Sequence, residues 1–174
     1  SNIYAVSGCQ NSRLEGSVTL KSKNGSASVI EAARFSDTDD QGNEKNEIVC
    51  SANISVTGKD YASGIKITRG NLILDNAVIT ARVTDKAKAD YAYAVYAVYE
   101  NNNISITGKS KITGNIRTGS TADSDKVSIE SGSKLVGSMD GVETVELILN
   151  DKSQAKQSLW DVTKVLGDAV DLNI

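Results

Sequence analysis

The sequence has no histidine and no proline, and aromatic residues make up only 5% of its 174 positions. Without histidine the chain cannot form a Ser-His-Asp or Cys-His nucleophilic site, and it lacks the usual zinc ligand set. With so few large aromatic side chains, it has little with which to fill a wide globular core. No apolar run approaches the roughly 18 residues of a membrane-spanning helix, so we expect no membrane span in this segment.

The charge and the cysteine content exclude further classes. A net charge of −3 without a cluster of Lys and Arg argues against nucleic acid as the main partner. Two cysteines, Cys9 and Cys50, are too few for a disulfide scaffold. One bridge between them and two free buried thiols are both compatible with the sequence, because spacing alone cannot place two Cα atoms within bonding range. Nothing in the sequence indicates a cofactor.

Small polar and aliphatic residues dominate instead. Ser, Thr and Asn occupy 47 of the 174 positions, and there are 14 glycines. The apolar share of 39% is mostly Val, Ile, Leu and Ala. This composition is typical of short strands joined by tight turns.

A repeat organises the chain. Residues 103–116 align without a gap with residues 126–139, so that four apolar pairs coincide: Ile104/Val127, Ile106/Ile129, Ile112/Leu135 and Ile116/Met139. Residues 53–58 are similar to the strand at 103–108, 50 residues later, and residues 145–149 are similar to residues 170–174, 25 residues later. Short elements that recur every 18 to 25 residues indicate the coils of a solenoid.

Within each repeat the apolar residues alternate with polar ones, and Gly and Asn lie between the runs. We therefore predict an all-β fold, a parallel β-helix with protruding loops, over a single segment 1–174. Its seven or eight coils would form a rod of roughly 35 Å at the spacing of paired strands. An antiparallel β-sandwich is the alternative, although it does not predict the ungapped repeat.

Four segments depart from the regular pattern. Residues 35–47 and 115–126 are predicted to be loops, and residues 81–90 a longer arm or a short helical turn. Residues 154–166 fit both a helix and a strand, and we prefer the strand because the coils continue on both sides.

The last third of the sequence contains four consecutive strand-like segments: a short one at 134–139, an aliphatic one at 145–150, the Ser-Leu-Trp-Asp-Val run at 158–162 and a last one at 170–172. This succession resembles the late coils of bacterial autotransporter passenger domains. It implies a right-handed β-helix that is exported through an outer-membrane barrel and often acts as an adhesin. Two cysteines, and a glycine as late as Gly167, depart from the family pattern. Because the chain begins and ends within strand-like runs, we expect it to be a fragment of a longer passenger domain.

Carboxylates gather in two of the predicted loops. Asp37, Asp39, Asp40, Glu44 and Glu47 form the densest group, and Asp123 and Asp125 form a second. Neither has the D-x-[DN]-x-[DN]-G spacing of a calcium loop, so we interpret both as solvated loops and expect no metal site.

The tyrosines are the best candidates for a binding site. Four of the six lie within nine residues: Tyr91, Tyr93, Tyr96 and Tyr99. In an extended strand Tyr91, Tyr93 and Tyr99 would share one face and Tyr96 would take the other. Such a row could stack sugars or anchor a protein, or it could simply cover a neighbouring coil.

These features predict a non-enzymatic, adhesin-like segment, secreted or on the bacterial cell surface. It would bind an extracellular or host-cell glycan or protein, and the strand edge at 170–174 could support self-association. The alternative is a β-helical carbohydrate-active enzyme, either a hydrolase or a lyase, or a carbohydrate-binding module. We assign no catalytic residue, because no known catalytic motif of that class is present.

Overall fold

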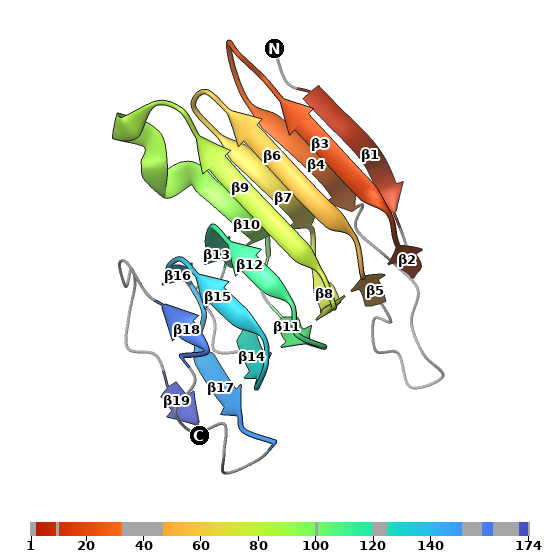
Figure 1. The fold of residues 1–174 in the computed structure, drawn as a ribbon, viewed down its shortest axis with the longest axis vertical. Coiled ribbons are helices and arrows are strands. Elements are labelled where there is room, and N and C mark those ends of the chain that lie inside the picture. The colour runs from red at the N-terminus through yellow and green to blue at the C-terminus, as the bar shows by residue number, and fades with distance from the viewer. Residues whose placement is uncertain are drawn as a thin grey trace.

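The computed structural model describes residues 3–9, 11–32, 47–99, 101–119, 125–150, 158–161 and 171–173. These residues form three parallel β-sheets around one interior, together with one short helix (Figure 1). The 3-10 helix η1 (Lys86–Tyr91) lies between two strands at a corner of the structure.

The three sheets are here named A, B and C. Sheet A contains β1 (Ile3–Cys9), β4 (Ala27–Ala32), β7 (Ala62–Ile67), β10 (Ala92–Ala97), β13 (Asn115–Arg117) and β16 (Met139–Asp140). Sheet B contains β2 (Ser12–Leu14), β5 (Glu47–Cys50), β8 (Gly70–Asp75), β11 (Asn102–Thr107), β14 (Lys126–Glu130), β17 (Thr144–Ile148) and β19 (Asp171–Asn173). Sheet C contains β3 (Ser17–Lys21), β6 (Asn53–Gly58), β9 (Val78–Val83), β12 (Lys111–Thr113), β15 (Lys134–Val136) and β18 (Trp160–Asp161).

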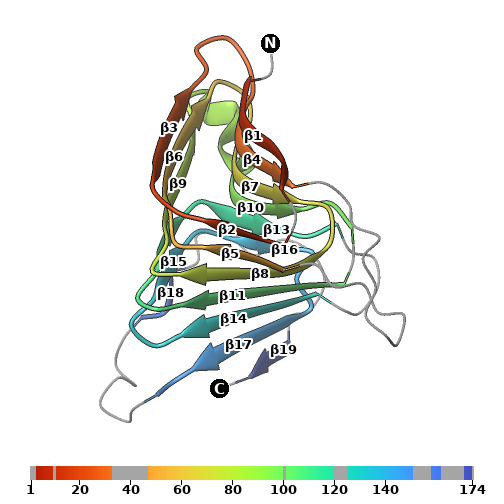
Figure 2. The same cartoon turned by 90° about the vertical axis from the view of Figure 1, so that its right-hand side faces the viewer.

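The chain enters these sheets in rotation, so that a strand pairs with the strand one coil before it and one coil after it. Strand β4 pairs with β1 and β7, and β11 pairs with β8 and β14, always in parallel. In Figure 2 the strands of sheet B lie one below another from β2 to β19, with the chain ends at opposite ends of the stack. The predicted all-β parallel β-helix is therefore confirmed. The antiparallel sandwich is wrong.

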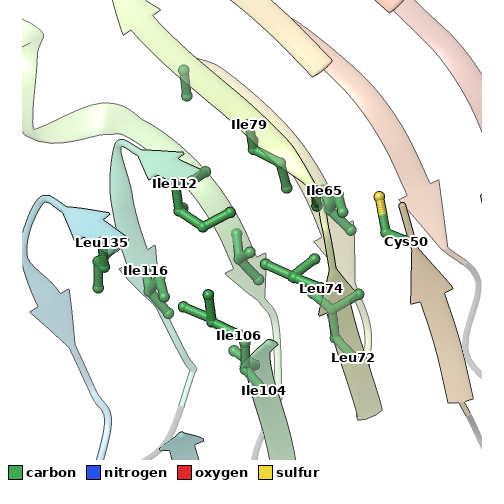
Figure 3. Close-up of a cluster of buried hydrophobic side chains, with 14 of the residues drawn as sticks. Cys50, Ile65, Leu72, Leu74, Ile79, Ile104, Ile106, Ile112, Ile116 and Leu135 are labelled. Atoms are coloured by element: carbon green, nitrogen blue, oxygen red, sulfur yellow. The ribbon is translucent and has the colours of Figure 1, made fainter. Parts of the chain in front are cut away.

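Each sheet turns a column of aliphatic side chains toward the interior (Figure 3). Every member of these columns is at most 4% exposed: Ile30, Ile65, Val95, Ile116 and Met139 in sheet A, Ile48, Leu72, Ile104, Val127 and Val145 in sheet B, and Ile54, Ile79, Ile112 and Leu135 in sheet C. Because coils stack at about 4.8 Å, branched aliphatic side chains fill such an interior without aromatic rings. The low aromatic content thus follows from the architecture.

The 23-residue repeat predicts the stacking register in all three sheets. Ile104 pairs with Val127 in sheet B, Ile112 with Leu135 in sheet C, and Ile116 with Met139 in sheet A. Outward-facing positions match as well, since the hydroxyl of Ser128 donates to that of Ser105 at 3.2 Å.

Two other sequence alignments are corrected by the structure. Residues 53–58 form β6 in sheet C, whereas residues 103–107 lie in β11 of sheet B, so these similar strands do not stack. Alternating Ile and Ser fits an inward-outward strand in any sheet, so similarity between two strands does not identify the sheet. Strand β19 (Asp171–Asn173) does pair with β17, but Val145 pairs with Leu172, two residues later in the sequence than the alignment predicts.

A corner between sheets C and A depends on stacked glycines. Gly114 and Gly137 follow β12 and β15, and their φ angles are +126° and +156°. A Cβ atom on Gly137 would lie 2.2 Å from the carbonyl oxygen of Gly114, so no larger residue fits while the coils keep their spacing.

The predictions for the segments that depart from the regular coil are confirmed in some cases and wrong in others. Residues 86–91 form the predicted helical turn as η1. The loop predicted over 115–126 is wrong at both ends, because Asn115 begins β13 and Lys126 begins β14. In the last segment Trp160 and Asp161 form a strand as preferred, whereas its other residues except Ser158 and Leu159 lie outside the described part of the chain.

The structure describes only two of the seven loop carboxylates, Glu47 and Asp125. Asp37, Asp39, Asp40, Glu44 and Asp123 lie outside the described residues, and Glu47 opens β5.

Asp125 is fully buried, so its prediction as a solvated loop residue is wrong. The backbone N–H of Asn102 donates to Asp125 Oδ1 at 2.7 Å, and the Asn102 side chain donates to the same oxygen at 3.0 Å. The carboxylate thus satisfies backbone and side-chain donors at the corner that leads into sheet B.

Candidate functional site

Four tyrosine rings form a cluster on the outer face of sheet A. The ring of Tyr93 stacks on that of Tyr96 with centroids 5.4 Å apart, lies 5.7 Å from Tyr61 and meets Tyr91 edge-on at 6.4 Å. These separations fall in the favourable range for aromatic pairs. We call these four residues the tyrosine cluster.

An irregularity in β10 places Tyr93 and Tyr96 in one cluster. Ala94 and Val95 are both buried in the core, and the register with β13 shifts between Tyr93 and Val95. The inward-outward alternation therefore restarts within the strand. The predicted separation of Tyr96 from the face that carries Tyr91 and Tyr93 is wrong for this reason.

Tyr93 lies at the centre of the cluster and is only 5% exposed, although it belongs to no inward column. An Nη1 N–H of Arg117 donates to its phenolic oxygen at 3.2 Å. Burial raises the pKa of the Tyr93 hydroxyl, while the hydrogen bond from Arg117 opposes that shift. Burial likewise raises the pKa of Tyr61 to about 12. Both phenols therefore stay protonated at neutral pH and can donate hydrogen bonds.

A column of charged side chains borders the cluster. Glu31, Lys66, Tyr96, Arg117 and Asp140 occupy successive paired positions along sheet A. The ammonium of Lys66 lies 2.7 Å from Glu31, and Arg117 Nε lies 3.5 Å from Asp140 Oδ2. The Arg117 guanidinium is also 5.8 Å from the Tyr96 ring centroid, a cation–π distance. The ion pair with Asp140 on one side and the Tyr96 ring on the other position the guanidinium beside the tyrosine cluster.

Helix η1 supplies the exposed wall of the site. Asp85 caps the helix by accepting the backbone N–H of Ala87 at 2.9 Å. At the other end, the Asn115 side chain donates to the carbonyl oxygen of Asp90 at 3.0 Å, which ties the helix end to sheet A. Tyr91, the last residue of the helix, is 41% exposed.

Between this helix end and sheet A lies a pocket of about 190 Å³, here called the tyrosine pocket. It is lined by Asp90, Tyr91, Tyr93, Asn115, Arg117, Ser138 and Asp140. Aromatic rings meet polar side chains there, the arrangement that small-molecule sites use to combine contact area with orientation.

The structure therefore brings together three of the four predicted tyrosines. Tyr91 and Tyr93 line the tyrosine pocket, and Tyr96 supports Tyr93 from the side. Tyr99 lies two residues beyond β10, is 46% exposed and is not among the residues that line the pocket. Its carbonyl oxygen accepts a hydrogen bond from the side chain of Asn102.

Sequence reasoning missed Tyr61, Arg117 and Asp140. A signal for Tyr61 exists in the sequence: Ala62 pairs with Ala92 and Ile65 with Val95, so residues 61–67 and 91–97 are equivalent in successive coils. This match begins at Tyr61 and Tyr91, 30 residues apart.

A Cys9–Cys50 bridge and two free thiols both stay predictions, because only one of the two side chains is described. Cys50 packs within the core without a disulfide to any other described cysteine, and burial raises the pKa of its thiol. The side chain of Cys9 lies outside the described part of the chain.

A second, more open hollow of about 500 Å³ lies over the outer face of sheet C. Its lining includes Lys111, Thr113, Lys134 and Ser158, and in the described part of the chain it includes no aromatic ring. Lys111 and Lys134 occupy paired positions. The described lining also includes the aliphatic Ile112 and Val136, so this hollow differs from the tyrosine pocket in having no aromatic ring and no carboxylate.

Comparisons with protein-family models, curated proteins and solved structures gave no match. Among the described residues, no helix is long and apolar enough to cross a membrane, and no group of three or more acidic or cysteine side chains could hold a metal ion.

Proposed function

We propose that this chain is an adhesin-like, non-enzymatic β-helical segment that binds a glycan in the tyrosine pocket. The observation that carries the proposal is the half-exposed ring of Tyr91 beside a buried phenol, a guanidinium and a carboxylate in one pocket. A sugar presents an apolar face of C–H groups and a rim of hydroxyls, and this pocket offers a counterpart for each.

The fold supports such a role because it holds the pocket rigidly. Arg117 and Asp140 lie on successive strands, and Asn115 donates a hydrogen bond from β13 to the end of η1. Binding side chains that rigid strands already hold in place lose little further conformational freedom when a ligand binds. A solenoid can thus present the pocket on its outer face while the inward columns maintain the fold.

The resemblance of the late coils to autotransporter passenger domains supports a location for this binding. We propose that the segment is secreted or displayed at the bacterial outer membrane, where the partner is a glycan of a host cell or of the extracellular environment. A protein ligand is the competing partner.

A glycan array tests the proposal directly. Wild-type protein should bind a subset of glycans, and Tyr91→Ser should lose at least about 2 kcal/mol of binding free energy, because it removes the exposed wall. Tyr99→Ser is the matched control, since it removes an equally exposed ring outside the pocket. Equal binding by the wild type and by Tyr91→Ser, or binding only to proteins, would contradict the proposal.

The enzymatic alternative has one observation in its favour. Two carboxylates, Asp90 and Asp140, line the tyrosine pocket, and glycosidases act through carboxylate pairs. The ion pair between Asp140 and Arg117 instead favours a carboxylate that holds a ligand. An assay for polysaccharide cleavage decides between the two, because release of new sugar ends would establish an enzyme.

A further inference from the structure

The tyrosine pocket contains a buried donor that is not used within the described part of the chain. Arginine can only donate, so the hydrogen bond from Arg117 occupies a lone pair of the Tyr93 oxygen and leaves its hydroxyl proton unused. Tyr93 is 5% exposed and lines the pocket, and none of the described residues accepts that proton. A buried donor without an acceptor is costly, and a ligand oxygen in the pocket would satisfy it.

An acceptor lies close to this donor. Arg117 Nε faces Asp140 Oδ2 at 3.5 Å, and this one contact leaves the carboxylate of Asp140, which lines the pocket, with further capacity to accept. Arg117 also keeps donors on its second terminal nitrogen, because its contacts to Tyr93 and Asp140 involve Nη1 and Nε. Donors and a charged acceptor therefore alternate along one wall of the pocket.

This alternation matches neighbouring hydroxyl groups. Each hydroxyl donates one hydrogen bond and accepts others, so one hydroxyl can donate to Asp140 while it accepts from Arg117, and the next can accept from Tyr93. A ligand carboxylate or sulfate can only accept, and it would face Asp140 without a proton to offer.

The charge of the pocket points the same way. Asp90 and Asp140 contribute two negative charges to the lining and Arg117 one positive charge. Asp140 pairs with Arg117, so their charges offset each other. Asp90 and the nearby Lys88, whose ammonium lies 5.4 Å from the Tyr91 ring centroid, are both exposed, so solvent screens their charges. The described lining therefore offers an anionic ligand no unpaired positive charge.

We propose that the tyrosine pocket selects uncharged sugars, holds them through two neighbouring hydroxyls and rejects acidic sugars. This inference rests on the proposed glycan-binding function and adds the ligand class. Tyr91 provides the apolar wall, Tyr93 and Arg117 the donors, and Asp140 the charged acceptor.

The test uses matched probes that differ in charge. Ligand-observed NMR and calorimetry would measure binding of the methyl glycosides of glucose, mannose and galactose, each compared with the corresponding methyl uronide. We expect at least one neutral glycoside to bind ten or more times as tightly as its uronide. If a uronide binds as well as its neutral partner or better, this inference fails while glycan binding stands. If no probe binds and the glycan array is also blank, the proposed function itself fails.

One variant and its control test whether the carboxylate of Asp140 causes the preference for neutral sugars. Asp140→Asn should weaken binding of the neutral glycoside about tenfold or more, because a charge-assisted hydrogen bond is lost. It should also narrow the gap between neutral and acidic probes, since the lining loses a negative charge. Asp161→Asn is the matched control, because it alters a similar ion pair, with Lys134 on sheet C, and Asp161 is not among the residues that line the tyrosine pocket. Unchanged selectivity in Asp140→Asn, or an equal effect of Asp161→Asn, would overturn the assignment.

Discussion

Replacing Ile106 by Ala should show how strongly an inward column stabilises the fold. Ile106 is fully buried, and its β11 position pairs with Leu74 of β8 and Ile129 of β14. Buried Ile→Ala substitutions cost about 2–5 kcal/mol, depending on how far the surroundings relax into the space. Parallel ladders above and below fix the coil spacing, so little relaxation is available. We therefore expect a loss in the upper part of that range, about 3–5 kcal/mol.

Urea denaturation followed by circular dichroism would measure this loss. The control is Asn103→Ala in the same strand, where the side chain is exposed and the expected change is within about 0.5 kcal/mol. Ile106→Asp should be more severe, since it also buries a charge without a partner. If Ile106→Ala and Asn103→Ala unfold at the same urea concentration, the inward column is wrongly assigned.

Three further predictions test the corners, a buried carboxylate and the tyrosine cluster. Gly137→Ala should lower the free energy of unfolding, measured by thermal denaturation, by about 3 kcal/mol, because its φ angle is positive and the added Cβ meets the carbonyl oxygen of Gly114. Gly16→Ala should cost only about 1 kcal/mol, because its φ angle is also positive but the added Cβ meets no atom. Equal losses would show that the corner can open. Asp125→Ala should cost about 1–3 kcal/mol, because it leaves the N–H of Asn102 buried without its acceptor, and a neutral result in a denaturation series would contradict that role. The folded state holds the Tyr61 proton more tightly than the unfolded state, so the contribution of Tyr61 to stability should be constant below pH 10 and should be lost as the pH rises toward its folded-state pKa of about 12. Tyr61→Phe should reduce that fall, and an unchanged pH profile would refute the cause.

The fold could be predicted because each coil repeats a simple physical requirement. An inward position needs an aliphatic residue and a turn needs Gly or Asn, so the match of 103–116 to 126–139 gives the register in three sheets at once. The same requirement explains the wrong alignment of 53–58 with 103–108, because strands of sheets B and C share the alternation of aliphatic and polar residues.

The site was harder to predict, because its residues come from three coils. Tyr61, Tyr93 and Arg117 come together because successive coils stack in sheet A. The coils differ in length, so no single sequence spacing aligns these three residues. The shift within β10 also breaks the alternation on which the assignment of Tyr96 depended. Asp125 accepts hydrogen bonds from Asn102 of the preceding coil, a contact that forms only when the two coils stack.

Chemical-shift mapping tests the central claim most directly. Assigned two-dimensional NMR spectra of the protein would be recorded during titration with the methyl hexoside that binds most tightly. The account predicts that the largest shifts cluster at Tyr91, Asn115, Arg117 and Ser138, which line the tyrosine pocket. Shifts centred on the Lys111 and Lys134 hollow of sheet C, or no saturable shifts at all, would contradict it.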